Sequence, residues 1–331
     1  MHTEQRVKQS GWKAYLVSLL AAMSTLVSAQ TSPASFPTKP VRIIVPQTPG
    51  GASDALARIV GQKLSEKWGQ AVVVENRPGA GGNIGMDAVA KAPGDGHTLL
   101  MSYVGSHAIN PSIYSKLPFD PEADFVAVAT LANVPFVAAV NSNVPVTNMK
   151  SLAAYATQKP VSFGSAGNGS VNHLLGEMFK SATGAPLVHV PMKGSAQAVT
   201  EAAAARIDVL FSSYISGQGF LKDGRFKALA YAGPQRSPLL PEVPTLAEMG
   251  LANLEYDQWF GFFVPAKVPE AIVRKLNAEL IKATQHPELM AVIAAQDATI
   301  LTTSPEGLER KIAQESNRYG EVIKRLGGKL N

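Results

Sequence analysis

The chain has 331 residues, of which 46% are apolar and 17% charged, with a net charge of +5 and no cysteine. This length suits about two domains, and the composition is typical of a globular protein with a substantial core. The lack of cysteine excludes disulfides, thiolate catalysis and cysteine-bound zinc. The positive charge is too small and too dispersed to indicate nucleic-acid binding, so we expect no nucleic-acid partner.

The N-terminus carries a basic segment that ends at Lys13 and is followed by an apolar run over residues 14–23. This run is shorter than the ~20 residues that a membrane-spanning helix needs. It leads into small residues that end at Ala29, a pattern typical of a cleavage site. The sequence therefore predicts a signal peptide over residues 1–29, removed near Ala29, and a periplasmic mature protein. An uncleaved anchor is the alternative.

From residue 41 onward, short apolar runs alternate with amphipathic stretches of helical period. The first region predicts strands over 41–45, 71–74 and 98–101, with helices over 56–68 and 84–91. A second region predicts strands over 161–163, 187–190, 208–211 and 226–231, with helices over 174–179 and 196–205. The tail predicts a strand over 259–264 and helices over 269–283 and 305–325. Strands joined by helices in this way favour parallel pairing.

The repeated pattern predicts an α/β protein of two similar lobes. The stretches 136–142 and 229–233 are candidate connections between the lobes, because each is β-type and flanked by proline or polar residues. The first lobe would then be discontinuous, with residues 36–140 plus 234–331, and the second would contain residues 141–233. Ligands of such sheets bind beyond the carboxyl ends of the strands, at domain interfaces.

The loop after the first predicted strand is the first candidate binding segment. Glycines let its backbone approach a ligand, and the first-turn amides of the following helix have no helical partner. These amides lie at the positive end of the helix dipole and can bind a carboxylate or phosphate. The alternative is a turn in which the glycines serve geometry alone. The candidate residues are Thr48, Pro49, Gly50, Gly51, Ser53 and Asp54, and either Ser53 or Asp54 can cap the helix.

The second predicted lobe contains a similar loop in the stretch FGSAGNGSVNHLLG. Its candidate residues are Ser165, Ala166, Gly167, Asn168, Gly169, Ser170 and His173. Ser170 can equally act as a plain N-cap, and a lone histidine at position 173 favours capping or packing over ligand contact. Two helix N-termini that face each other across a cleft would suit a small dicarboxylate.

Two further loops follow predicted strands and offer Ser102 and Tyr103, and Ser212 and Tyr214. For each, an ordinary polar surface loop is the alternative. Lys193 favours a charge pair or a helix cap over direct ligand contact.

The motifs of common enzyme classes are missing from the sequence. It contains no G-x-S-x-G, no P-loop and no H-E-x-x-H, and Gly79-Ala80-Gly81 does not complete a dinucleotide fingerprint. Six histidines make a histidine-rich metal site unfavourable. We expect no catalytic residues, no cofactor and no metal, although a secreted α/β enzyme that acts on a small organic acid stays open.

Segments in order along the whole predicted mature chain resemble the Bug family of extracytoplasmic solute-binding receptors, the TctC-like partners of tripartite tricarboxylate transporters. They include PTKPVRIIVPQTPGGASDALAR, VVVENRPGAGGNIGMDAVAKAPGDGHTLL, NPSIYSKLPFDPEADF, FGSAGNGSVNHLLGEMF, HVPMKGSAQAV, RSPLLPEVPTLAEMGL and WFGFFVPAKVP. The resemblance implies a type II periplasmic-binding-protein fold, in which two lobes joined by two strands close on a ligand. It also implies a carboxylate held by backbone amides and waters at Thr48 to Asp54 and Ser165 to Ser170.

Three departures from the family pattern concern residues near these loops. Met192 stands where the family usually has tyrosine, Ser212 where an acidic residue is often found, and residues 204–206 replace a glycine-rich turn. The loss of an acidic group at Ser212 argues against an amino-acid ligand. We therefore expect a monomeric, non-enzymatic receptor that hands a small carboxylate (a di- or tricarboxylate or related acid) to membrane transporter subunits. A periplasmic co-sensor for a membrane kinase is a further alternative.

Overall fold

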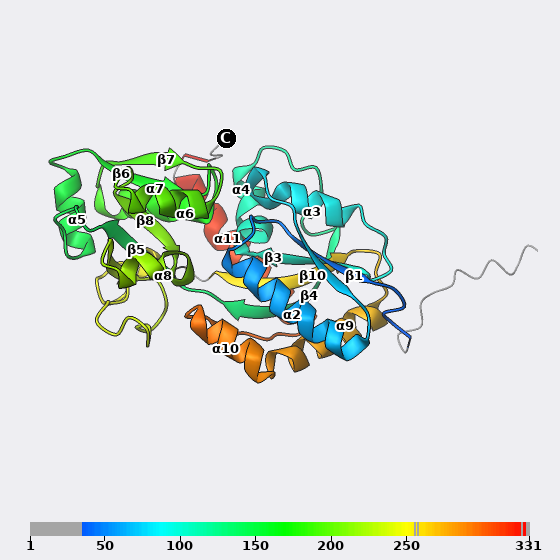
Figure 1. Cartoon of the computed structure of the whole chain (residues 1–331). Coiled ribbons are helices and arrows are strands. Elements are labelled where there is room, and N and C mark those ends of the chain that lie inside the picture. Colours follow the sequence, from blue (N-terminus) through cyan, green and yellow to red (C-terminus); the bar gives the residue numbers. More distant parts are fainter. Residues whose placement is uncertain (1–34, 255, 257, 326, 329–331) are drawn as a thin grey trace, which may run out of the picture. The chain divides into compact units, whose positions relative to one another are not determined.

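The computed structural model describes residues 35–254, 256, 258–325 and 327–328. The predicted signal peptide, residues 1–29, lies outside the described residues. From Pro37 onward the described residues form one compact unit that contains two mixed β-sheets, each covered by helices (Figure 1). Among the described helices, none has the length and apolarity required to cross a lipid bilayer.

Sheet A has six strands in the spatial order β11-β4-β10-β3-β1-β2. They are β1 (Val41–Val45), β2 (Val72–Asn76), β3 (Thr98–Tyr103), β4 (Phe125–Asn133), β10 (Trp259–Pro265) and β11 (Thr299–Ile300). β1 pairs in parallel with β2 and β3, whereas β10 runs antiparallel to β3 and β4. The predicted parallel arrangement is thus confirmed for the first three strands, and the C-terminal region adds the antiparallel ones.

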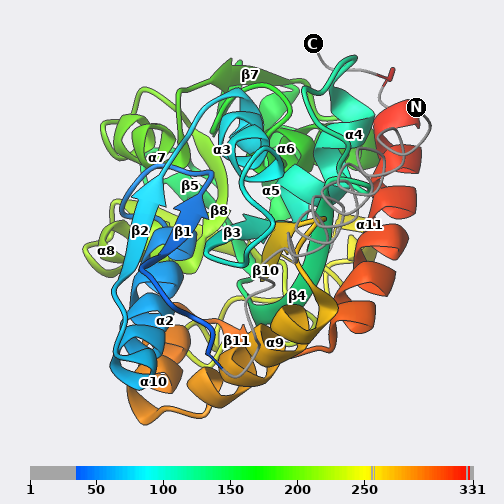
Figure 2. The ribbon, with the colours of Figure 1, turned by 90° about the vertical axis from the view of Figure 1, so that its right-hand side faces the viewer.

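Helices cover both faces of sheet A (Figure 2). They are α2 (Ala52–Trp68), α3 (Asn83–Ala90), α4 (Asn110–Ile113), α9 (Glu270–Thr284), α10 (Pro287–Ala295) and α11 (Pro305–Arg325), with the short turns η2 (Ala80–Gly82) and η3 (Gly105–Ile109). α2 packs against α9 and α10, while α11 packs against α4, η3 and β4. The C-terminal helices therefore complete the lobe that the N-terminal strands begin.

Sheet B has five strands in the order β7-β6-β8-β5-β9. They are β5 (Phe136–Asn141), β6 (Val161–Ser165), β7 (Leu187–Pro191), β8 (Val209–Ser213) and β9 (Phe226–Tyr231), accompanied by α5 (Met149–Ala156), α6 (Val171–Thr183), α7 (Ser195–Ala203) and α8 (Tyr214–Lys222), with the turn η4 (Ala252–Leu254) further along the chain. β6 pairs in parallel with β7 and β8, and β5 is antiparallel to β8 and β9. The strand–loop–helix pattern predicted for the second lobe is confirmed.

The chain passes from sheet A to sheet B between Asn133 and Phe136, and it returns between Tyr231 and Trp259. The stretches 136–142 and 229–233, predicted as connections, belong to or overlap β5 and β9 of sheet B. The division into a lobe of residues 36–140 plus 234–331 and a lobe of residues 141–233 stays a proposal.

Several strands extend further than predicted, and in β3, β6 and β8 the extension includes candidate site residues. Ser102 and Tyr103 belong to β3, Ser165 ends β6, and Ser212 belongs to β8, whereas all four were expected in loops. The physical reason is pairing with strands distant in sequence. Tyr103 and Ser102 lie opposite Phe260 and Gly261 of β10, Ser165 lies opposite Pro191, and Ser212 lies opposite Val137.

The packing of α6 on β6 predicts a sharp steric limit at Gly176. A Cβ atom on this residue would overlap the ring of Phe163, which is fully buried. We expect Gly176→Ala to lower the free energy of unfolding by about 1–3 kcal/mol, measured by urea denaturation. The control is Gly219→Ala in α8, where a Cβ atom would have open space. That change should raise stability by up to about 1 kcal/mol, since alanine favours helix. Equal stability of the two variants would contradict this packing.

Candidate functional site

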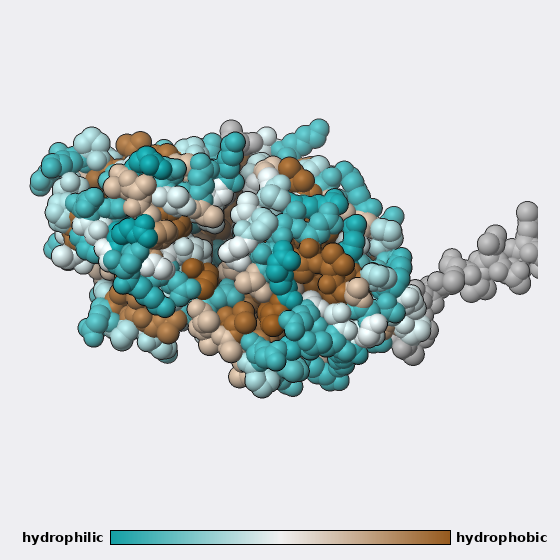
Figure 3. Space-filling view, in the orientation of Figure 1, coloured by the Kyte–Doolittle hydropathy of each residue, from teal (hydrophilic) through white to brown (hydrophobic). Residues whose placement is uncertain are grey.

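A cavity of about 440 Å³ lies between the ends of the two sheets. Its volume falls within the range of small-molecule sites. On the face seen in Figure 3, apolar residues gather in several separate patches among hydrophilic ones. The sheet A side of the cavity is formed by Pro46, Gln47, Thr48, Gly51, Ala52, Pro78, Gly79, Ala80, Gly81, Gly82, Tyr103, Tyr114, Gln258 and Phe260. The sheet B side is formed by Phe136, Ala166, Gly167, Asn168, Ser170, Val171, Asn172, Met192, Lys193, Gly194, Ser195, Ser212, Ser213 and Ser216.

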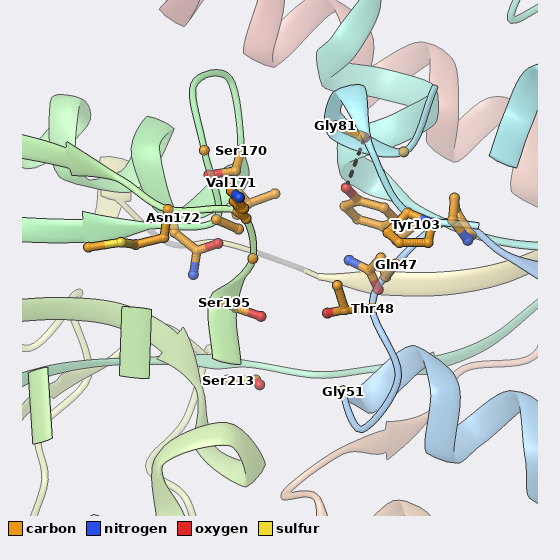
Figure 4. Close-up of a pocket in the computed structure, with 18 of the residues that line it drawn as sticks. Gln47, Thr48, Gly51, Gly81, Tyr103, Ser170, Val171, Asn172, Ser195 and Ser213 are labelled. Carbon is orange, nitrogen blue, oxygen red and sulfur yellow. Dashed lines mark hydrogen bonds between the residues drawn. The ribbon is translucent and has the colours of Figure 1, made fainter. Parts of the chain in front are cut away.

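Helix N-termini from both sides open onto this cavity. Gly51 and Ala52 begin α2, Ser170 and Val171 begin α6, and Ser195 begins α7 (Figure 4). The start of α8 contributes as well, through its N-cap residue Ser213. First-turn amides lack partners within their own helix and carry the positive end of the helix dipole. The structure brings the predicted helix start of each half to this cavity, and it adds the start of α7, which was not predicted there.

Only part of the first predicted loop lines the cavity. Thr48 and Gly51 do, whereas Pro49, Gly50, Ser53 and Asp54 are not among the lining residues. The expectation that Ser53 or Asp54 is the N-cap is wrong, because the N-cap is Gly51 and has no side-chain cap.

Asp54 instead stabilises the loop between β1 and α2 through its side chain. Its carboxylate accepts a hydrogen bond of 3.0 Å from the Gly50 amide and pairs with Arg58 at 2.9 Å. Burial by itself raises the pKa of Asp54, but the bonds from Arg58 and Gly50 outweigh it and leave the pKa lowered. The Ser53 hydroxyl donates to the Gln47 side chain. Both residues thus hold the loop in shape from outside the lining.

The second predicted loop divides in the same way. Ala166, Gly167, Asn168 and Ser170 line the cavity, while Ser165, Gly169 and His173 are not among its lining residues. The predicted N-cap is confirmed, since the Ser170 hydroxyl accepts from the His173 amide.

Two stacked histidines hold this loop. The rings of His173 and His189 lie 3.8 Å apart at 12°. Nδ1 of His173 accepts from the Gly169 amide at 3.1 Å, and Nε2 of His189 lies 2.6 Å from the Ser165 hydroxyl. That hydroxyl in turn accepts from the Gly167 amide at 3.0 Å. The packing role expected of His173 is thus confirmed.

Of the four residues predicted as ligand contacts in the two remaining loops, two line the cavity. Tyr103 and Ser212 line the cavity, whereas Ser102 and Tyr214 do not. The Ser102 hydroxyl is buried and lies 2.7 Å from Nδ1 of His107. Tyr214 begins α8 and is buried in the second lobe.

A glycine-rich turn, Gly79–Gly82, is a lining segment that sequence analysis missed. The Gly81 carbonyl accepts hydrogen bonds from the Tyr103 hydroxyl at 3.2 Å and from the side-chain amide of Asn110 at 3.0 Å. Gly81 has φ +66° and Gly82 has φ +99°, a region that favours glycine. The run of glycines before α3 is a sequence feature that could have indicated this turn, but the sequence analysis compared it only with the dinucleotide-binding motif. Gln258 reaches the cavity from the segment that connects β9 to β10, and Phe136 from the start of β5, and neither had a local signal.

The formal charge of the cavity lining is positive. Of the described residues that line it, Lys193 alone has a formally charged side chain, and none is acidic. Within the described part of the chain, no cluster of three or more metal-binding side chains is found. Amide donors and one ammonium group suit an anion.

The histidine pair predicts a pH dependence of stability. Burial first, then the charges of His173 and Lys180, lower the pKa of His189 to about 4, and burial also lowers the pKa of His173. In the unfolded chain both histidines bind a proton below about pH 6.5, whereas in the folded protein they stay neutral to lower pH. The free energy of unfolding therefore has its full value above about pH 6.5 and falls as the pH decreases toward 4. Melting temperatures measured between these values should follow this course. His189→Gln should give a shallower slope than wild type, and an unchanged slope would contradict the assignment.

Comparison with known proteins places the chain among receptors. The profile of the family described as the tripartite tricarboxylate transporter family receptor matches residues 56–328. Protein BugT of Bordetella pertussis is 34% identical over 92% of this chain and 94% of its own.

Solved structures with bound acids resemble the chain closely. Rpa4515 of R. palustris with adipate is 34% identical, with a TM-score of 0.84, over 89% of this chain and 99% of its own. MatC from Rhodopseudomonas palustris with bound malate is 28% identical, with a TM-score of 0.81, over 87% of this chain and 100% of its own.

Proposed function

The chain belongs to the tripartite tricarboxylate transporter family of receptors, and on that premise we propose that it captures a small organic carboxylate in the cavity between its two sheets. Like its relatives it is a periplasmic solute-binding protein of the Bug type and not an enzyme. The family resemblance and the two-lobe binding-protein fold expected from the sequence are confirmed.

The observation that carries the ligand class is the convergence of helix N-termini on a cavity without an acidic residue in its described lining. Amide donors at helix starts bind carboxylates without needing a counter-charge on each oxygen. The proposed contacts are the backbone amides of Thr48 and Gly51 on one side and of Ala166 and Asn168 on the other, all of which belong to lining residues. Asp54, Ser165 and His173 are proposed to position these loops.

Ser212 supports a plain acid over an amino acid. It is a buried residue of the cavity wall and has no formal charge. A ligand ammonium group would need a carboxylate partner when the cavity closes, because an unpaired buried charge is costly. No described lining residue supplies that carboxylate, so dicarboxylates and related organic acids fit best.

Binding is proposed to proceed by closure of the two lobes around the anion, with the ligand stabilising the closed state. The mature receptor, after cleavage of the signal peptide near Ala29, is proposed to be a monomer. It then presents the acid to the membrane subunits of the transporter. Mass spectrometry of acids that co-purify with the native protein identifies the ligand. A raised melting temperature without chemical conversion of that acid supports the receptor role. Conversion of the acid by the purified protein, or no thermal shift with any small carboxylate, would refute it.

A charge placed at Ser212 tests the ligand class. We expect Ser212→Asp to weaken binding of a dicarboxylate at least tenfold, since like charges ~6 Å apart at an effective dielectric of about 20 repel by roughly 3 kcal/mol. Asparagine has a shape similar to that of aspartate but no charge. The affinity of Ser212→Asn for the dicarboxylate should therefore stay within about threefold of wild type by the same argument. Titration calorimetry at neutral pH measures both. Equal affinities of the two variants would place the anion elsewhere.

A further inference from the structure

Lys193 occupies a particular place in the cavity, because it carries the one formal charge among the described lining residues. It lies in the segment Met192–Gly194, here called the lysine loop, which joins β7 to α7. Sequence analysis favoured a charge pair or a helix cap for this residue. Within the part of the chain that the structure describes, no carboxylate oxygen lies within 4.0 Å of its ammonium group. Its charge is thus available to a ligand.

The backbone of the lysine loop is held on both sides. The Met192 amide donates to the Ser165 carbonyl at 3.1 Å, which extends the pairing of β6 with β7. The Lys193 amide donates to the side chain of Gln197 in α7 at 3.2 Å. The side chain of Lys193 itself is exposed. A fixed backbone with a free ammonium group is the arrangement expected of a ligand-selecting residue rather than of a structural ion pair.

The lysine loop also touches both loops that are proposed to hold the carboxylate. A Cβ atom on Gly194 would lie 3.5 Å from the Thr48 side chain, which belongs to the opposite side of the cavity. A Cβ atom on Gly167 would lie 3.2 Å from the Met192 carbonyl. Lys193 therefore lies where the two sides of the cavity meet.

A ligand with two carboxylates presents an electrostatic problem that helix amides do not fully solve. Each helix N-terminus supplies the equivalent of roughly half a positive charge. Enclosure of a second full negative charge removes its water, which costs free energy unless a counter-charge is near. A monocarboxylate, once seated on the amides, makes no such demand.

We propose that Lys193 is a specificity-determining residue that pairs with the second carboxylate of the ligand and makes the receptor select diacids over monoacids. The inference rests on the proposed carboxylate-binding function and adds to it the number of charges that the ligand carries. It predicts that removal of the Lys193 charge affects diacids and leaves monoacids unchanged. If Lys193 instead paired with the first carboxylate, both kinds of acid would lose affinity equally.

The test measures affinities by titration calorimetry for succinate, adipate and suberate, each beside the monoacid of equal chain length, butyrate, hexanoate or octanoate. For wild type we expect at least one diacid to bind about tenfold more tightly than its monoacid. Lys193→Met should reduce that diacid's affinity about tenfold and leave the monoacid unchanged, while Lys193→Arg keeps most of the preference. Added salt should narrow the preference of wild type.

Lys150→Met is the matched control, since Lys150 is an exposed lysine of the second lobe outside the cavity lining. It should behave as wild type, and circular dichroism verifies that each variant is folded. Equal losses for diacid and monoacid in Lys193→Met, no loss for either, or a wild-type preference for monoacids would overturn the inference while the carboxylate receptor stands. Failure of wild type to bind any of the acids would refute the proposed function as well.

Discussion

Peptide amides at the first turns of α2, α6, α7 and α8 are the donors on which the cavity depends. No backbone carbonyl of the same helix accepts from them, so they require water, a side chain such as the Ser170 N-cap, or a ligand. Each of these helices follows a strand of its own sheet, and parallel strands bring their carboxyl ends to one edge. The connection order β1-α2, β6-α6, β7-α7 and β8-α8 therefore delivers the amides to a common space without any charged side chain.

Side chains in and beside the cavity wall hold the loops that surround these amides. The loop at Ser165 to Ser170 is shaped by the stacked rings of His173 and His189. The turn at Gly79–Gly82 is held through its carbonyl by Tyr103 and Asn110. Because preorganised donors lose little freedom when a ligand arrives, these supporting residues affect affinity although they need not touch the ligand. This explains why several polar residues near the cavity are not part of its wall.

Small residues mark the places where the two sides of the cavity approach each other. Gly194 lies against Thr48, and Gly169 lies against Ile113 of α4, so close that a Cβ atom would meet the isoleucine at 2.7 Å. At Gly169 this leaves no room for a larger residue, whereas at Gly194 a Cβ atom would make an ordinary contact with Thr48.

Much of the local structure followed from periodicity and turn chemistry. The bounds of the first strand, of β9 and of α11 agree with those predicted, and both predicted gripping loops contribute to the cavity. The errors arose where local rules lack information. The N-cap of α2 is Gly51 and neither Ser53 nor Asp54, and Tyr103 and Ser212 belong to strands and not to the predicted loops. Pairing partners distant in sequence extended those strands.

The sequence by itself determined the alternation of strand, glycine-rich loop and helix, because hydrophobic period and helix starts depend on neighbours within a few residues. It also determined that position 212 holds a serine and no acidic group. Only the tertiary structure decided which residues meet. β10 enters sheet A between β3 and β4 from more than a hundred residues away, and Gln258 and Lys193 reach the cavity from opposite sheets. Such convergence depends on long-range strand pairing, which no local pattern records.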